Sequence, residues 1–516
     1  MKKQLSFLLA LLMVFSCLTV LPLTASAEGN VAEVIDSEGN SRGFYSDFGE
    51  ALNGVNSILD NYTIRLVADV TISSGWVVDC RRVRNFTIDG NGHTITQTTD
   101  GDSAYALTIT GKGKVNFTCT LKNLNIVSAG PCVRVAMGHV IFDGGHYVTN
   151  TTAYTSTIVV NYDAGTNYHT VETNPMPYAY AQFVGGVYEA MGTKTELVLN
   201  LHSSGIEGRT AADIYGGYYH GSATTQRIVN VADSLHGNIY GGTFIADNTA
   251  SNASIIFSNG SKDGQTVATV YGGVYHMDAS NQMLWCNKAT ARLFYEGGTY
   301  YGWTAGYRDP TGRYNFSGTR LANDAPDTLG ASVRLVPDSN GLRFTSQISK
   351  GVIDRIAALK DAETELSFGT IICPTDYLTT SPAHMAGACM TIDALEAAGK
   401  TYLDIPAVNG IDTDDAGNVT VRAAVVNLLE DNIDRAFSAV AYVKAVIDGI
   451  EVYFYGYYNA TTNSASIREI ASMALADVKD AAEEGYDNLV SDGSAQNGKY
   501  SPYSAAQRAV LAGYLA

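Results

Sequence analysis

The sequence predicts a mainly β protein, in which a solenoid of parallel strands is followed by a smaller α+β domain. Three observations predict this: a repeated Gly-Gly-x-aromatic pattern, short apolar runs between its copies, and a change of pattern after about residue 300. No helical period is visible from about residue 60 to residue 300. The first part of the chain is therefore expected to consist of short strands separated by turns.

The Gly-Gly-x-aromatic pattern is an internal repeat. Its six copies are GGHY (144–147), GGVY (185–188), GGYY (216–219), GGTF (241–244), GGVY (272–275) and GGTY (297–300). The intervals between the copies are 41, 31, 25, 31 and 25 residues, in the range typical of solenoids, whereas a propeller blade needs about 40 residues and four strands. We expect each glycine pair to lie at the same corner of successive coils, with the aromatic rings stacked about 4.8 Å apart along the axis.

A second apolar run follows the glycine pair in each of the last four complete repeats. These runs are LVLNL (197–201), IVNV (228–231), IIF (255–257) and MLWC (283–286). The distance from such a run to the apolar residue before the next glycine pair alternates between 13 and 8 residues. Because the extra residues fall in the same turn, we expect three longer loops, 163–180, 202–213 and 258–269, to project from one edge about 10 Å apart.

The segment 61–96 carries a resemblance to a known family. It reads NYTIRLVADVTISSGWVVDCRRVRNFTIDGNGHTIT, and ALTIT (106–110) and CTLKNLNIVSAG (119–130) continue in the same style. These runs, FTIDGNGHTI above all, resemble the opening coils of the right-handed parallel β-helix of the pectate-lyase-like superfamily. The resemblance covers about residues 45–305 and implies a fold rather than an activity. We assign residues 28–305 to the β-helix and residues 306–328, rich in turn residues, to a linker.

Residues 329–516 are expected to form the α+β domain. Alternating runs such as GLRFTSQI and NVTVRAAVV predict strands, and Ser466 with Glu469 and Ser504 with Gln507 form sequence patterns of helix capping boxes. The segments GASVRL, GLRFTSQI, FGTIICPTDYL and YSPYSAAQRAVLAGYL resemble an uncharacterised module of secreted Firmicutes proteins. That resemblance implies a location outside the cell and assigns no activity.

The first 27 residues have the layout of a secretory signal peptide: two lysines, an apolar run and the end Ala25-Ser26-Ala27. The protein is therefore expected to be secreted, extracellular or associated with the cell surface. No later run reaches about 18 apolar residues, so no membrane span is expected. The six cysteines after the leader match no zinc-site spacing, and we expect most of them to be buried free thiols.

Charge restricts the partners. The formal net charge is −18, and it becomes −20 when Lys2 and Lys3 leave with the leader. Such a balance argues against nucleic acid or an anionic membrane as partner. A polysaccharide or cell-surface glycan of little charge fits better. No metal or other cofactor is expected, except Ca²⁺ if the chain is a lyase.

The longer loops carry the candidate site residues. Acidic, histidine and tyrosine side chains gathered on one edge are suited to a carbohydrate groove, where rings contact sugar faces and carboxylates accept hydroxyl hydrogen bonds. The alternative is that these side chains are polar only because exposed loops are polar. The candidates are Asp163, Tyr168, His169, Glu172, Tyr178, Tyr180, His202, Glu207, Arg209, Asp213, Lys262 and Asp263.

Three other motifs give weaker evidence for a functional site. RDPTGR (308–313) matches the Arg-x-Pro-x-x-Arg element of one pectate lyase family, but a plain turn explains it more simply. Glu189, His220 and His276 share one column of the repeat, yet three coils span about 14 Å, too far for one metal ion. DTDDAGNV (412–419) lacks the glycine and glutamate of an EF-hand loop and predicts a hairpin turn.

Two functions remain open from the sequence. One is a secreted polysaccharide-engaging β-helix, either carbohydrate-binding or a divergent polysaccharide lyase or glycoside hydrolase. The other is a non-catalytic cell-surface structural or adhesion protein, with the solenoid as a rigid spacer. The sequence identifies no catalytic residue and leaves open whether the chain is an enzyme.

Overall fold

The computed structural model describes most of the chain. It covers residues 29–56, 61–80, 85–111, 116–162, 178–203, 208–250, 252–260, 266–277, 283–286, 291–301, 307–308, 315–316, 325–359, 366–380, 390–408, 411–477, 479–480, 499–500 and 502–516. The segment expected to be a signal peptide lies outside these residues.

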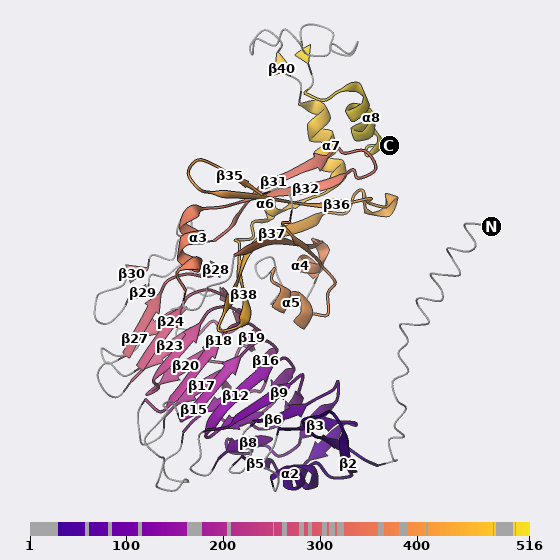
Figure 1. The fold of residues 1–516 in the computed structure, drawn as a ribbon. Coiled ribbons are helices and arrows are strands. Elements are labelled where there is room, and N and C mark those ends of the chain that lie inside the picture. Colours follow the sequence, from indigo (N-terminus) through magenta and orange to yellow (C-terminus); the bar gives the residue numbers. More distant parts are fainter. Residues whose placement is uncertain are drawn as a thin grey trace, which may run out of the picture.

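The first part is a parallel β-helix made of three long sheets, as the sequence predicts (Figure 1). Each coil passes from sheet A through sheet B to sheet C. Sheet A contains β1 (Ala32–Ile35), β2 (Ser41–Tyr45), β3 (Tyr62–Leu66), β6 (Asn85–Asp89), β9 (Thr118–Lys122), β12 (Gly138–Asp143), β15 (Ala179–Phe183), β18 (Thr210–Ile214), β21 (His236–Ile239), β24 (Thr266–Val270) and β27 (Ala291–Tyr295).

Each coil also adds one strand to each of the other two sheets. Sheet B contains β4 (Val70–Ile72), β7 (Thr94–Gln97), β10 (Asn125–Ser128), β13 (His146–Thr149), β16 (Val187–Ala190), β19 (Tyr218–Gly221), β22 (Thr243–Ala246), β25 (Val274–Met277) and β28 (Thr299–Tyr301). Sheet C contains β5 (Trp76–Asp79), β8 (Leu107–Thr110), β11 (Val133–Val135), β14 (Thr155–Val160), β17 (Thr195–His202), β20 (Arg227–Ala232), β23 (Ser254–Asn259) and β26 (Leu284–Cys286).

The glycine pairs lie in one column, at the corner between sheets A and B. The second glycine of every pair has a positive φ, from 95° to 111°, which explains why the residue is glycine. A Cβ atom on Gly241 would lie 2.3 Å from the carbonyl oxygen of Tyr215, so glycine is needed at this first position for close approach between coils. The six aromatic rings that follow stack with centroids 4.7 to 5.1 Å apart, which confirms the predicted ladder.

The N-terminal end of the solenoid is closed by helix α2 (Phe48–Asn56). Phe48, Ala51 and Leu52 of this helix are buried in the core of the first coils. Strand β1 pairs antiparallel with both β2 and β3. The first edge of sheet A is therefore a short antiparallel addition rather than a further coil, an arrangement that covers the end of a repeat structure.

The predicted loop bounds were wrong at their C-terminal ends. Residues 179–183, 210–214 and 266–270 are strands of sheet A rather than parts of loops. These strands carry little apolar signal because their inward column contains Ala181, Ala212, Gly237 and Ala268 and their outward residues are largely polar. The sequence pattern therefore showed only two of the three strands of each coil.

Beyond the β-helix lies a domain of antiparallel sheets and helices. One sheet has the order β31 (Asp327–Arg334), β32 (Gly341–Ile348), β36 (Val419–Val426) and β35 (Asp412–Thr413). The other has the order β34 (Leu403–Pro406), β33 (Ser367–Pro374), β37 (Phe437–Ile447) and β38 (Ile450–Tyr455), and β39 (Ser464–Ala465) pairs with β37. Two small hairpins are β29 (Tyr307–Arg308) with β30 (Asn315–Phe316) and β40 (Lys479–Asp480) with β41 (Lys499–Tyr500).

The helices of this domain are short. They are α3 (Lys350–Ala357), α4 (Asp376–Thr380), α5 (Ile392–Ala397), the 3₁₀ turn η2 (Glu430–Asn432), α6 (Ala460–Asn463), α7 (Ile467–Ala476) and α8 (Ala505–Gly513). Ser466 caps α7 by accepting a hydrogen bond from the backbone of Glu469. Ser504 and Gln507 form the complete capping box predicted for α8. The turn at 412–419 is a hairpin, as predicted, because β35 and β36 pair across it.

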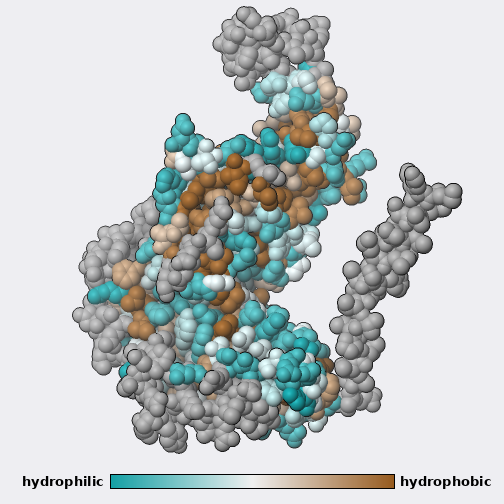
Figure 2. All heavy atoms as spheres, viewed as in Figure 1, coloured by the Kyte–Doolittle hydropathy of each residue, from teal (hydrophilic) through white to brown (hydrophobic). Residues whose placement is uncertain are grey.

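The C-terminal domain packs directly against the solenoid, along sheet B and its glycine corner. Tyr218, Ile245 and Val274 of sheet B share an apolar cluster with the α5 and β37 region. The hydroxyls of Thr243 and Thr391 lie 2.7 Å apart across this contact. Figure 1 shows hairpin β37–β38 reaching down beside β18 and β19, and Figure 2 shows apolar side chains gathered on this domain above a more hydrophilic solenoid.

Two further findings concern the part of the chain described here. None of its helices is long and apolar enough to cross a membrane. Five cysteines are buried free thiols, as expected: Cys80, Cys119, Cys132, Cys286 and Cys373. Cys389 lies outside the described residues.

Candidate functional site

Sheet A presents a largely polar outer face that follows the length of the solenoid. Strand register places one outward residue of each coil above the next. From the first coil to the last, this column contains Thr63, Thr87, Thr120, Ile141, Gln182, Asp213, Asn238, Thr269 and Phe294. From Ile141 onward each member precedes the first glycine of a pair by three residues, a sequence signal from which the column could have been found.

Asp213 is the centre of a hydrogen-bonded cluster on this face. Its Oδ2 accepts a hydrogen bond of 2.5 Å from the hydroxyl of Tyr180, and its Oδ1 accepts one of 2.9 Å from Nδ2 of Asn238. Nε2 of His236 lies 3.3 Å from the same Oδ1. Asp213 is only 8% exposed, so these contacts replace water around a carboxylate. The structure thus brings together two of the predicted site residues, Tyr180 and Asp213.

A small residue makes this convergence geometrically feasible. Tyr180, Ala211 and His236 follow one another in a second outward column of sheet A. Because Ala211 has only a methyl group, the rings of Tyr180 and His236 approach each other from both sides, with centroids 6.4 Å apart. Both side chains can therefore reach Asp213 on the neighbouring column.

His139 and Gln182 extend the cluster toward the N-terminal coils. The His139 ring stacks on the Tyr180 ring with centroids 4.7 Å apart and planes 27° from parallel. Nε2 of His139 lies 2.8 Å from Oε1 of Gln182. We name the set His139, Tyr180, Gln182, Asp213, His236 and Asn238 the sheet A cluster. Only two of its members were predicted, because Tyr180 and Asp213 fall within the expected loops 163–180 and 202–213 and the other four lie outside them.

The electrostatics of the sheet A cluster favour an ionised Asp213 beside a neutral Tyr180 and a neutral His139. Burial alone would raise the pKa of Asp213, but the nearby His236 ring and hydrogen bonds from Tyr180 and Asn238 keep that pKa below its usual value. Burial and the neighbouring Asp213 raise the pKa of Tyr180. Burial lowers the pKa of His139. The cluster therefore contains a fixed acceptor, a neutral phenol and a neutral imidazole.

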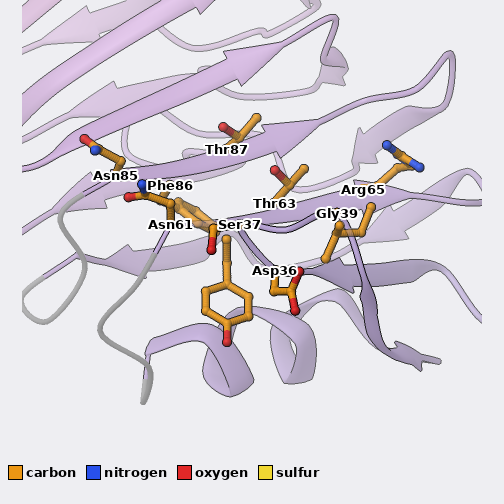
Figure 3. A pocket seen from close by; sticks show the side chains of 11 residues that line it. Asp36, Ser37, Gly39, Asn61, Thr63, Arg65, Asn85, Phe86 and Thr87 are labelled. Carbon is orange, nitrogen blue, oxygen red and sulfur yellow. The ribbon is translucent and has the colours of Figure 1, made fainter.

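A shallow pocket of about 390 Å³ lies on the same face, at its N-terminal end. Figure 3 shows Asn85, Thr87, Thr63 and Arg65 along two neighbouring strands, with Asp36 and its turn beside them. Oδ1 of Asp36 accepts hydrogen bonds from the backbone of Glu38 and Asn40, which helps to hold the turn between β1 and β2 in place. The pocket lining is rich in hydroxyl and amide groups. From β3 to β18 there are five strand steps, about 24 Å along the face.

The remaining described candidates, Tyr178, Arg209 and His202, lie outside the sheet A cluster. Tyr178 is 7% exposed and lies beneath the guanidinium of Arg209, which is 4.5 Å from its ring centroid. This tyrosine packs as core and does not offer an open ring face. His202 lies at the end of β17 in sheet C, with Nε2 4.0 Å from Asp233.

Seven candidates lie outside the described residues: Asp163, Tyr168, His169, Glu172, Glu207, Lys262 and Asp263. The same holds for most of the RDPTGR motif, of which only Arg308 is described.

The outer face of sheet B carries ion pairs around the buried His220. Nδ1 of His220 lies 3.4 Å from Glu189, and Nε2 of His220 lies 2.9 Å from Asp247. His276 stands two coils beyond His220, with Ile245 between them, in agreement with the predicted spacing. Within the described residues, no group of three or more His, Cys, Asp or Glu side chains could hold a metal ion.

Comparisons with protein-family models, with curated protein sequences and with solved structures found no match to this chain. The class of the protein is therefore defined by its own architecture: a three-sheet parallel β-helix with a polar face on sheet A and an antiparallel domain docked beside it.

The chemistry of the sheet A cluster suits binding better than acid–base catalysis. A general acid needs a raised pKa, whereas the Asp213 pKa is lowered. Fixed hydrogen-bond acceptors and donors beside the Tyr180 and His139 rings are what sugar hydroxyls require.

Proposed function

We propose that this chain is a secreted bacterial polysaccharide-binding protein of the pectate-lyase-like superfamily, and that the outer face of sheet A binds the glycan. The single observation that carries the proposal is the sheet A cluster, where the Tyr180 ring and the ionised Asp213 stand side by side on an extended polar face. The parallel β-helix and the FTIDGNGHTI segment support the superfamily. The pattern of residues 1–27 supports secretion.

A neutral glycan fits this face better than a polyuronate. The chain carries a net charge of −18, and a carboxylate stands at the centre of the cluster. Like charges placed together oppose binding, and water cannot fully screen a group as buried as Asp213. The pocket near β3 lies about 24 Å away on the same face, so we expect a chain of several sugars to be bound rather than a monosaccharide.

The test is a binding panel on residues 28–516. Neutral glycans and polyuronates, with and without Ca²⁺, are titrated by calorimetry, while unsaturated products are followed by absorbance and new reducing ends by a colour assay. We expect binding of a neutral glycan without products. Tyr180→Ala should weaken it about tenfold, the effect of losing one ring contact and one hydrogen bond.

The matched control is Tyr154→Ala, since Tyr154 is 64% exposed and lies before β14 of sheet C. This variant should bind like the wild type. Products in the panel would show that the chain is a lyase or hydrolase instead. Absence of binding to every glycan would favour the other function, a rigid non-catalytic spacer at the cell surface.

A further inference from the structure

We infer that Asp448 of the C-terminal domain is a positioning residue for the sheet A cluster, acting through Tyr215 and Gln182 on the ring of His139. The expected effect of Asp448 on glycan binding rests on the proposed function. It makes the docked domain part of the site rather than a separate module.

We call the chain of hydrogen bonds from Asp448 through Tyr215 and Gln182 to His139 the relay. It begins at the turn of hairpin β37–β38. Strand pairing continues to Ile447 and Ile450, so Asp448 and Gly449 form a two-residue turn. Both residues have positive φ, 52° and 79°, as a tight hairpin turn requires. Oδ2 of Asp448 accepts a hydrogen bond of 2.7 Å from the hydroxyl of Tyr215, which follows β18.

Packing holds this turn in place over the glycine corner. Val452 and Phe454 of β38 fill the space that Gly241 and Gly272 leave open, because a Cβ atom on either glycine would lie 3.1 Å or less from them. The ring of Tyr215 is stacked on that of Tyr240, with centroids 5.2 Å apart. Neither end of the first hydrogen bond is therefore free to move away.

The direction of each hydrogen bond follows from the first. A carboxylate only accepts, so the Tyr215 hydroxyl must donate its single proton to Asp448. The Tyr215 oxygen then accepts from Nε2 of Gln182 at 3.4 Å. This orientation of the amide points Oε1 of Gln182 at Nε2 of His139, 2.8 Å away. That nitrogen must carry the proton, because an amide oxygen can only accept.

The consequence is a defined tautomer of His139. With Nε2 protonated and the ring neutral, Nδ1 is left as an acceptor beside the ring of Tyr180. A ligand hydroxyl can donate to this nitrogen. Without Asp448, the Tyr215 hydroxyl is free to turn, the Gln182 amide can reverse, and both tautomers of His139 become accessible.

The first measurement needs no glycan. Histidine in the mature chain is labelled with ¹⁵N, and the ring signals are assigned by their loss in His139→Gln. We expect the wild type to show the Nε2–H tautomer of His139. Asp448→Gly removes the carboxylate in a residue type that tolerates positive φ, and it should produce a mixture of tautomers. Asp448→Asn, which keeps an oxygen acceptor, should restore most of the Nε2–H form.

Two further variants separate the relay from loss of structure. Tyr215→Phe removes the hydroxyl and keeps the stacked ring, and it should give the same tautomer mixture. Asp338→Gly changes an exposed aspartate that also has a positive φ, 60°, in the β31–β32 turn, and it should change nothing. We expect Asp448→Gly and Tyr215→Phe to weaken neutral glycan binding about fivefold, the effect of one hydrogen bond.

The outcomes are distinct. An unchanged His139 tautomer in both Asp448→Gly and Tyr215→Phe would overturn the inference, whatever the glycan result. A changed tautomer with no glycan binding by the wild type would refute the proposed function and leave the relay established.

Discussion

Tyr219 and Phe244 occupy equivalent positions on successive coils, and their rings stack with centroids 4.7 Å apart and planes 7° from parallel. The Tyr219 hydroxyl also donates a hydrogen bond of 2.9 Å to the carbonyl of Gly216, three residues earlier. Tyr188, Tyr275 and Tyr300 repeat this hydrogen bond on their own coils. The ring therefore serves twice: it continues the core from coil to coil and it closes the glycine corner of its own coil.

Tyr219→Ala should lower the free energy of unfolding by about 3 to 5 kcal/mol, because a fully buried ring is replaced by a cavity. Tyr219→Phe should cost only about 1 kcal/mol, since it removes the corner hydrogen bond and keeps the stack. Denaturant unfolding measures both. If the exposed control Tyr154→Ala lost as much stability as Tyr219→Ala, the ladder would not be a source of stability.

Gly242→Ala should destabilise the β-helix by about 2 kcal/mol, because Gly242 has a φ of 103°, which a residue with a Cβ atom adopts only with strain. The added Cβ would also lie 3.1 Å from the carbonyl oxygen of Gly217. The control is Gly513→Ala at the end of α8, where nothing lies within 4 Å of the added atom. Thermal unfolding should show a lower midpoint for Gly242→Ala and little change for the control.

His220→Gln should cost about 2 kcal/mol near pH 5.5, because Glu189 loses its buried partner and keeps the exposed His146, 2.7 Å away. Burial alone would raise the pKa of Glu189, but hydrogen bonds from His146 and His220 lower it to about 2. Burial alone would lower the pKa of His220, but Asp247 and Glu189 raise it to about 9.

The sign of the pH dependence follows from these two shifts. The raised pKa of His220 contributes stability that is complete below its ordinary value of 6.5 and is lost as the pH rises through 9. The lowered pKa of Glu189 contributes stability that is complete above 4.5 and is lost as the pH falls through 2. The stability difference between wild type and His220→Gln should therefore be largest from pH 4.5 to 6.5 and smaller at pH 10. A difference that does not vary with pH, or an equal effect of His93→Gln at a more exposed histidine, would contradict this.

Asp393→Asn should stabilise the protein at neutral pH. Asp393 accepts a hydrogen bond from the backbone of Gly217 across the domain contact, and desolvation raises its pKa from 3.8 to about 6. A carboxyl group with a raised pKa favours the folded state only while it is protonated, so stability falls as the pH rises from about 4 to 6. The asparagine keeps an acceptor for Gly217 and removes the charge.

We expect a gain of the order of 2 kcal/mol for Asp393→Asn at pH 7.5 and almost none at pH 3.5. Unfolding curves at the two pH values measure it. The matched variant Glu396→Gln changes an acid on the same helix whose carboxylate accepts a hydrogen bond from Tyr402, and it should lack this gain. Destabilisation by Asp393→Asn at pH 7.5 would show that the carboxylate is favourable in the contact.

Part of the candidate site was accessible from sequence. Tyr180 and Asp213 were named because they lie in the expected longer loops, and the structure joins them by a hydrogen bond. Their partners His139 and Asn238 were missed because both lie outside the expected loops; the strand of Asn238, β21, also has Gly237 in its inward column. A strand without an alternating apolar signal is not visible to pattern reading, even when its register is regular.

By itself, the sequence determined the repeat, the glycine corner and the stacked rings, because these depend on spacings that recur every coil. Only the tertiary structure decided that Asp448 meets Tyr215, 233 residues away, and that Asp393 meets Gly217. These contacts depend on how two differently built faces fit together. Such a fit occurs once in the molecule and leaves no period in the chain.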